Sequence, residues 1–326
     1  MQMYTILHNE KIYRFMLLLR ASVVVQSTVM SKRKVTKAVI AAAGFGTRFL
    51  PQTKAMPKEM LPLVDKPIIQ QIVEELSGAG ITDIVIVTGY HKRTLEDHFD
   101  RMSSDLRSNL ENAKKDVLLE TTSKISELAN FAYIRQKGPY GTGTPLLNAA
   151  HLIGDEPFIY TFADDFVQAT PSRFKQLVQV YEERGESVLT AVRRDDDEDY
   201  KRYGYISGDD LGKGQFDVKT IIEKPGTRES APSDLASVSG YVFDGAIVEY
   251  LQKQMKTYDS TKEFMIQEAM QEMIKDGKHI YALEIQNGKY YDTGNPLEYL
   301  KTVFDFAMKR EDIGPKLKEH LQKLLG

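Results

Sequence analysis

The stretch KAVIAAAGFGTRFLPQTKAMPKEMLPLVDKP, from Lys37 to Pro67, carries the most information about the fold of this 326-residue chain. It opens with KAVIAA (Lys37 to Ala42), an apolar run that predicts a buried first strand. A glycine-rich loop follows the strand at once. A strand that runs directly into such a loop is typical of open α/β sheets, in which ligands bind beyond the carboxyl ends of the strands.

The loop after this strand has the composition of a phosphate site. Gly44 and Gly46 allow a sharp turn and leave backbone N–H groups free to face phosphate oxygens. Arg48 adds a forked donor with a permanent charge, and Lys58 adds a mobile point charge. A dinucleotide-binding GxGxxG motif would need glycine where Phe49 stands, and the P-loop spacing is absent as well. The segment therefore predicts a phosphate loop of another kind.

From Lys37 onward, short β-rich runs alternate with helical stretches. This pattern predicts an α/β fold with a Rossmann-like, mostly parallel mixed sheet covered by helices on both faces. Ile68, Ile69, Ile72, Val73 and Leu76 fall on one helical face after Pro67. Further strands are predicted at DIVIVTG, FAYIRQ, PFIYTF, SVLTAVRR, VKTIIEK and SVSGYVF, and helices at 245–254, 263–275 and from Pro296 to the C-terminus. The acidic run DDDEDY (Asp195 to Tyr200) is interpreted as a solvated loop.

The chain is expected to divide into three parts. Residues 1–34 form an N-terminal extension, for which Met30 is the expected natural start; its apolar runs are interrupted by Arg20 and are shorter than the roughly 20 residues of a membrane helix. Residues 35–310 form the catalytic domain, with a helical insertion at about 103–130, and residues 311–326 form a C-terminal helix.

Composition narrows the possible partners. The formal net charge is -3, from 43 basic and 46 acidic residues, so no broad positive surface is expected to hold nucleic acid. The chain has no cysteine, which excludes disulfides, thiolate metal sites and thiol nucleophiles. Any bound phosphate must therefore be held by local groups.

Two further motifs carry charges suited to such a ligand. PFIYTF ends in Ala163, Asp164 and Asp165, and carboxylates at a strand end are either metal ligands or part of a solvated turn. IIEKP contains Glu223 and Lys224, which either hold a ligand or mark the end of an edge strand at a proline.

Taken with these motifs, the loop resembles the signature of the sugar nucleotidyltransferases, and PKEMLPLVDKP resembles the bacterial UTP:glucose-1-phosphate uridylyltransferase family. The resemblance covers nearly everything after Met30. Related thymidylyltransferases share the glycine-arginine loop but generally carry a different stretch after it. PKEMLPLVDKP is therefore the discriminating piece.

The resemblance implies a role for each matching residue. The residues implied in catalysis are Arg48, Lys58 and Lys224; in nucleotide binding, Ala43, Gly44, Gly46, Glu59, Gln136 and Gly141; in sugar-phosphate binding, Gly204, Glu223, Lys224 and Gly240; and in binding the Mg²⁺ cofactor, Asp164 and Asp292. Asp165 departs from the family pattern, so Asp164 is preferred to Asp165 as the metal ligand.

The reaction that the resemblance implies is attack of glucose 1-phosphate on the α-phosphorus of UTP, which gives UDP-glucose and pyrophosphate. A cytoplasmic homo-oligomer, a dimer or a tetramer, with no membrane or nucleic-acid partner is expected. Three alternatives remain open: the same chemistry with dTTP or another sugar 1-phosphate, a regulatory paralogue that only binds a UDP-sugar, and a glycosyltransferase. The last class typically shows a metal-binding Asp-x-Asp, which ADDF (Ala163 to Phe166) does not match.

Overall fold

A computed structural model describes residues 34–326, and residues Val35–Gly326 form one compact unit. The expected extension before residue 34, its Met30 start and its apolar runs lie outside the described residues. None of the helices between residues 34 and 326 combines the length and the apolar content needed to cross a bilayer.

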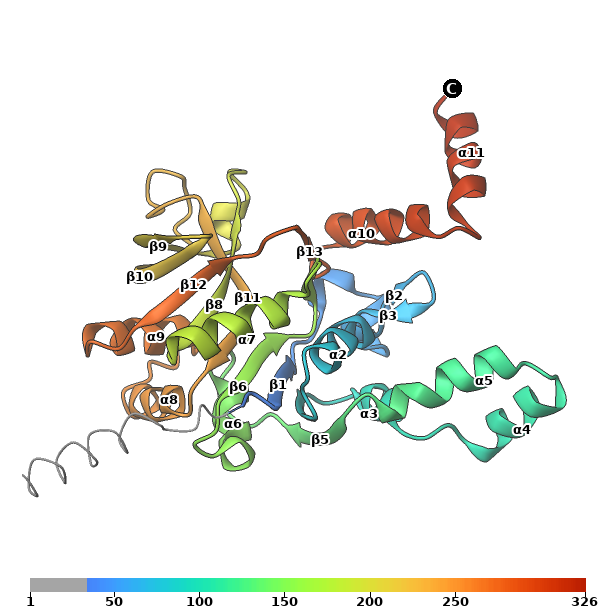
Figure 1. The fold of residues 1–326 in the computed structure, drawn as a ribbon, viewed down its shortest axis with the longest axis horizontal. Helices are drawn as coiled ribbons and strands as arrows, with labels where there is room; N and C mark the ends of the chain where they lie inside the picture. The colour runs from blue at the N-terminus through green and yellow to red at the C-terminus, as the bar shows by residue number, and fades with distance from the viewer. Residues whose placement is uncertain (1–33) are drawn as a thin grey trace, which may run out of the picture. The chain divides into compact units, whose positions relative to one another are not determined.

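Within the described residues, nine strands form one sheet in the order β5-β4-β1-β6-β11-β8-β12-β10-β9 (Figure 1). Two small pairs, β13 with β7 and β2 with β3, lie outside this sheet. The strands are β1 (Lys37–Ala42), β2 (Pro62–Leu63), β3 (Lys66–Pro67), β4 (Asp83–Thr88), β5 (Asn130–Arg135), β6 (Phe158–Phe162), β7 (Asp165–Ala169), β8 (Ser187–Arg193), β9 (Gly204–Gly212), β10 (Gln215–Glu223), β11 (Leu235–Phe243), β12 (Ile280–Glu284) and β13 (Gly288–Asp292).

The sheet is mixed, and its parallel part lies where the phosphate loop leaves it. Strands β5, β4, β1 and β6 pair in parallel, as β8 does with β12. Strand β11 is antiparallel to both β6 and β8, and β10 is antiparallel to β12 and β9. The expected α/β class with a mixed sheet is confirmed.

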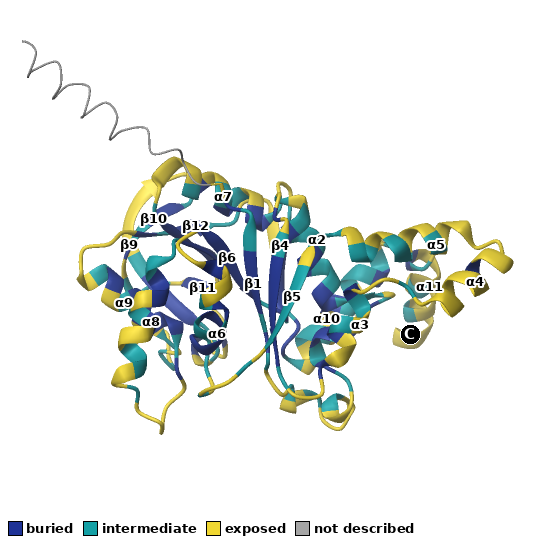
Figure 2. Ribbon diagram, turned by 90° about the horizontal axis from the view of Figure 1, so that it is seen from below, coloured by how far each residue is buried: buried dark blue, intermediate teal, exposed yellow. Residues whose placement is uncertain are grey.

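Helices cover both faces of the sheet because the central strands are apolar on both sides. Along β1, Val39 packs into one core with α6, α8 and α9, whereas Ala38 and Ile40 pack into a second core with α2, α3 and α7. The central strands β4, β1, β6 and β11 consequently run as a buried layer between helices (Figure 2). The helices are α2 (Ile68–Gly78), α3 (Arg93–Phe99), α4 (Ser104–Asn112), α5 (Asp116–Ser123), α6 (Thr144–Ile153), α7 (Arg173–Arg184), α8 (Ala246–Lys256), α9 (Ile266–Lys275), α10 (Pro296–Lys309) and α11 (Gly314–Leu325).

Two stretches outside the sheet bear on the sequence predictions. Helices α4 and α5 occupy the stretch expected to be a helical insertion, and they lie apart from the sheet in both views (Figures 1 and 2). The prediction that the acidic run 195–200 is a solvated loop is wrong for its last two residues, because Asp199 and Tyr200 are only 2% and 1% exposed. There the chain turns inward through a short 3₁₀ helix (Asp199–Lys201), and the ring of Tyr200 stacks on that of Tyr205.

Candidate active site

The site begins where two parallel strands end side by side. Strands β1 and β6 pair Ala41 with Phe162, so the phosphate loop and Asp164 leave the sheet at the same edge. The loop then folds back on itself, since the Thr53 hydroxyl donates to the Gly46 carbonyl at 2.7 Å. This fold brings the Lys58 ammonium onto the carboxylate of Asp164, where the two groups form a short ion pair.

The second carboxylate arrives on the hairpin of β13 with β7. In this pair Asp292 lies opposite Asp165, and the Thr293 N–H donates to the Asp164 carbonyl at 2.9 Å. Oxygen atoms of Asp164 and Asp292 lie 2.8 and 3.1 Å from the point that a Cβ on Gly294 would occupy. Both carboxylates therefore face one small space, which any side chain at position 294 would fill.

This paired arrangement fits a hard divalent cation. No group of three or more carboxylate, histidine or cysteine ligands is gathered anywhere in residues 34–326. Mg²⁺ commonly binds through one or two carboxylates and completes its octahedral shell with phosphate oxygens and water. Asp164 and Asp292 supply that donor set and leave the remaining positions to a ligand.

Charge around Asp164 favours its ionised form. Burial opposes ionisation, but Lys58, Lys92 and Arg48 outweigh it and lower the pKa of Asp164. Burial likewise opposes the charge on Lys58, yet Asp164 and Glu59 raise its pKa. The carboxylate and the ammonium therefore both stay charged at neutral pH.

Asp165 differs from its neighbour Asp164 in every contact. Its carboxylate accepts hydrogen bonds from the Ser239 hydroxyl, from the Ser239 N–H at 3.2 Å and from the Tyr290 hydroxyl at 3.0 Å. Burial raises the pKa of Asp165 to about 6. Its oxygens are turned toward Ser239 and Tyr290, whereas an oxygen of Asp164 lies with an oxygen of Asp292 beside Gly294, which supports the preference for Asp164 as the metal ligand.

The opposite wall comes from the antiparallel pair β9 and β10. Gly204 pairs with Glu223, and a Cβ on Gly204 would lie 2.8 Å from Glu223 Oε2. That oxygen is buried and has no hydrogen-bond partner among the described residues, so Glu223 brings an unsatisfied acceptor to the lining of the cleft. Lys224 follows with φ of 48°, a conformation uncommon outside glycine and often found at functional sites.

These elements enclose a cleft of about 230 Å³. Of the predicted site residues, it is lined by Arg48, Asp164, Gly204, Glu223, Lys224 and Asp292, and Lys58 adjoins it through Asp164. Lining residues without a predicted role include Arg202, Tyr203, Ser239 and Tyr290. These side chains meet only because distant strands pair, so no local sequence motif predicts that they line the cleft.

The other predicted residues lie beside the cleft or behind it. A Cβ on Gly44 would lie 3.8 Å from Lys58 Nζ, and the carbonyl of Ala43 lies under Gly89. Gln136 follows β5, where its N–H donates to the Thr88 carbonyl at 2.8 Å. Gly141 lies against the backbone of Phe264, too close for any side chain.

One of the implied ligand contacts, that of Glu59, disagrees with the packing. The carboxylate of Glu59 is enclosed and pairs with Lys92 at 2.6 Å, so it supports the loop instead of facing a nucleotide. Gly240 backs onto Thr190 and the buried Arg173, where a Cβ would approach to 2.7 Å. Glycine is needed there for packing and for a φ of 103°, and the flanking Ser239 and Tyr241 both line the cleft.

Comparison with known proteins agrees with this geometry. The profile of the family described as "Nucleotidyl transferase" matches residues 37–308. The chain belongs to this family. Within it, the chain is 42% identical over 292 residues to the UTP–glucose-1-phosphate uridylyltransferase of Staphylococcus epidermidis, covering 90% of this chain and 99% of that one. The resemblance found in the loop is thereby confirmed.

Two solved structures have the same fold. One is a UDP-glucose pyrophosphorylase complexed with UDP-glucose, with a TM-score of 0.75 and 37% identity over 85% of this chain and 100% of the other. The second is a UTP-bound UGPase from Acinetobacter baumannii, with a TM-score of 0.79 and 30% identity over 89% of this chain and 99% of the other.

Proposed function

We propose that this chain transfers a uridylyl group from UTP to glucose 1-phosphate, which yields UDP-glucose and pyrophosphate. The observation that carries the proposal is the convergence of Arg48, Lys58 and Lys224 with the carboxylates of Asp164 and Asp292 around one cleft. The similar proteins that were solved with UTP and with UDP-glucose support this choice of nucleotide and product.

Two polyanions must meet for this reaction, so the first task of the site is to neutralise them. Arg48 and Lys58 lie on the side of the phosphate loop and suit the triphosphate, whereas Lys224 lies on the side of β9 and β10 and suits the sugar phosphate. The phosphate oxygen that attacks is already ionised near neutral pH. The proposal therefore needs no protein nucleophile and no general base.

Glucose would be held by the wall that carries Glu223. Its unpartnered Oε2 accepts a hydrogen bond from a sugar hydroxyl, and the missing side chain at Gly204 gives the ring access to it. Asp164 and Asp292 would hold Mg²⁺, which supplies positive charge to the phosphate oxygens when bound. We also propose that the protein acts in the cytoplasm as a homo-oligomer, as its sequence family suggests.

The test is pyrophosphate release by the full chain with Mg²⁺, glucose 1-phosphate and either UTP or dTTP. The proposal expects faster release with UTP than with dTTP, and none when a chelator removes the cation. Equal rates would leave nucleotidyl transfer intact and remove the base preference. Absence of pyrophosphate with every nucleotide, together with binding of UDP-glucose, would favour the regulatory paralogue instead.

A further inference from the structure

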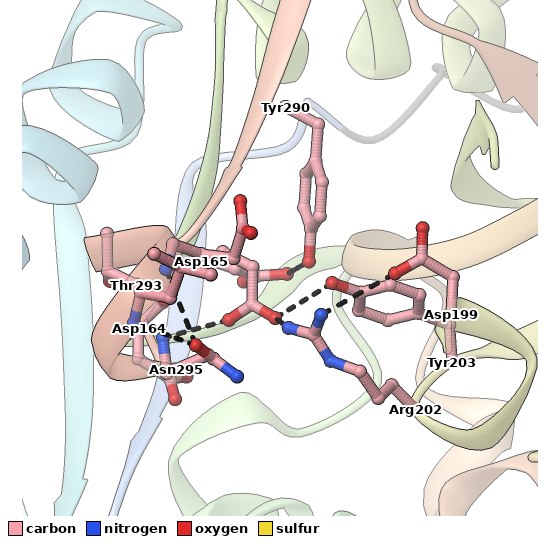
Figure 3. A network of polar contacts seen from close by, with 12 residues as sticks. Asp164, Asp165, Asp199, Arg202, Tyr203, Tyr290, Thr293 and Asn295 are labelled. Carbon is pink, nitrogen blue, oxygen red and sulfur yellow. Dashed lines mark hydrogen bonds and ion pairs between the residues drawn. The ribbon is translucent and has the colours of Figure 1, made fainter. Parts of the chain in front are cut away.

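Arg202 is a cation in the cleft to which the mechanism above gives no task. It lies just before β9, its side chain is 23% exposed, and its guanidinium pairs with the carboxylate of Asp292 (Figure 3). Lys58 pairs with Asp164 in the same way. Each of the two converging carboxylates thus has a cation of its own.

The backbone of Arg202 is fixed by a hydrogen bond, and its guanidinium is held by Asp292, by Asp199 and over the ring of Tyr203. The backbone N–H of Arg202 donates to the backbone carbonyl of Asp199 at 2.9 Å. The buried carboxylate of Asp199 lies 3.5 Å from the Arg202 guanidinium but 2.7 Å from that of Arg194. Asp199 therefore keeps a close cationic partner when the end of Arg202 moves away.

Asp292 also keeps partners without Arg202. The Tyr203 hydroxyl donates to its carboxylate at 2.8 Å, and the Gly294 N–H donates to it at 2.8 Å. Leaving a buried charge without any partner is strongly destabilising. Neither carboxylate is left without a partner when the guanidinium of Arg202 is released, which limits the cost of its release.

The position of Arg202 indicates which ligand would receive it. The carbonyl of the next residue, Tyr203, accepts a hydrogen bond from the Lys224 N–H at 3.1 Å. Arg202 and Lys224 therefore flank the same end of the β9 and β10 pair. A guanidinium there can donate two parallel hydrogen bonds to one phosphate group.

We propose that Arg202 is a displaceable counter-ion that neutralises Asp292 in the free chain and moves to the phosphate of the sugar 1-phosphate when Asp292 binds a divalent cation. This inference rests on the proposed function. It gives Arg202 two opposing effects, because the residue competes with the cation and assists the sugar phosphate.

The test compares wild type with Arg202→Gln, using Mn²⁺ alone as the probe in a substrate-free titration and then steady-state kinetics with Mg²⁺. Loss of a competing charge should make Mn²⁺ bind about tenfold more tightly. The KM for glucose 1-phosphate should rise by about tenfold or more, and more than the KM for UTP. Arg202→Lys keeps the charge without the fork, so its Mn²⁺ affinity should stay near wild type.

Two controls separate charge from general damage. Tyr203→Phe removes a neutral hydrogen bond to the same carboxylate and should not tighten Mn²⁺ binding. Arg193→Gln removes an exposed arginine that pairs with Asp234 and Glu284, and it should leave both readouts unchanged.

Equal or weaker Mn²⁺ binding by a folded Arg202→Gln chain, or equal rises in both KM values, would overturn the inference and make Arg202 a structural brace. The failure of the proposed function would look different, because wild type would then release no pyrophosphate, whereas the Mn²⁺ comparison needs no turnover.

Discussion

Lys224 is a single residue at which the proposed division of the cleft can be tested. Its backbone is held by Tyr203 at the end of β10, on the wall away from the phosphate loop. Lys224→Ala should therefore lower kcat/KM for glucose 1-phosphate by about a hundredfold, the usual effect of one lost charge in an active site, with a smaller effect on the KM for UTP. Steady-state kinetics with each substrate varied would show this, and equal losses for both substrates would contradict the division.

Gly141 is a second single residue that can be tested, in this case for its close packing against the backbone of Phe264. Its φ is 134°, and a Cβ there would lie 2.2 Å from the Phe264 carbonyl oxygen. Gly141→Ala should lower the free energy of unfolding by about 3 kcal/mol, because both the backbone and its neighbour would be strained. Gly78→Ala is the matched control: no atom lies within 4 Å of its Cβ position, which is at the exposed end of α2. That change should be neutral or slightly stabilising in urea unfolding.

Site residues that form a continuous motif could be predicted from the sequence. Site residues that meet only because distant strands pair could not. The glycines, Arg48 and Lys58 form one continuous loop, so their chemistry could be read from neighbouring letters. Arg202 and Tyr290 reach the cleft only because β9 pairs with β10 and β13 pairs with β7. The register between strands that are distant in the sequence cannot be predicted from a local sequence pattern.

Helix α3 carries His98, a titratable group that makes the free energy of unfolding depend on pH. Burial lowers the pKa of His98 from its ordinary value of 6.5, and its Nε2 lies 3.0 Å from Gln70 Oε1. Below pH 6.5 the unfolded chain therefore binds more protons than the folded chain, so the free energy of unfolding falls as the pH drops through this value. His98→Gln should lose this part of the pH dependence between about pH 5 and about pH 7.5. Identical pH profiles of denaturant midpoints in both chains would contradict the assignment.

Helix α10 depends on a cap beside the carboxylate pair. Asn295 accepts hydrogen bonds from the N–H groups of Leu297 at 2.9 Å and Glu298 at 3.4 Å. Asn295→Ala should lower the free energy of unfolding by about 1 kcal/mol, whereas Asn295→Ser keeps an acceptor and should lose less. Denaturant unfolding of the two variants checks this, and equal losses would show that the cap is not responsible.

The elements themselves were largely predictable from periodicity. The KAVIAA run is β1 from its first residue to its last, and the five apolar positions after Pro67 are all buried in α2. The acidic run failed because local charge predicts a solvated face, while Asp199 is buried by ion pairs with Arg194 and Arg202. Those partners are supplied by the tertiary fold.

For the molecule as a whole, the site is the product of topology. Its groups come from the loop after β1, the end of β6, the pair β9 and β10, and the β13 hairpin, which the sheet order brings together. The family resemblance could predict most of these residues, but not the packing that encloses Glu59. A single motif would not have been sufficient to predict which residues form the site.

The carboxylate pair is where the central claim is most exposed to test. Pyrophosphate release from UTP and glucose 1-phosphate should fall by about a hundredfold or more in Asp164→Asn and in Asp292→Asn, since each loses a negative charge at the point where the cation would bind. Asp65→Asn, an exposed carboxylate paired with Arg310, should keep the wild-type rate. Near wild-type release by both folded active-site variants would contradict the account.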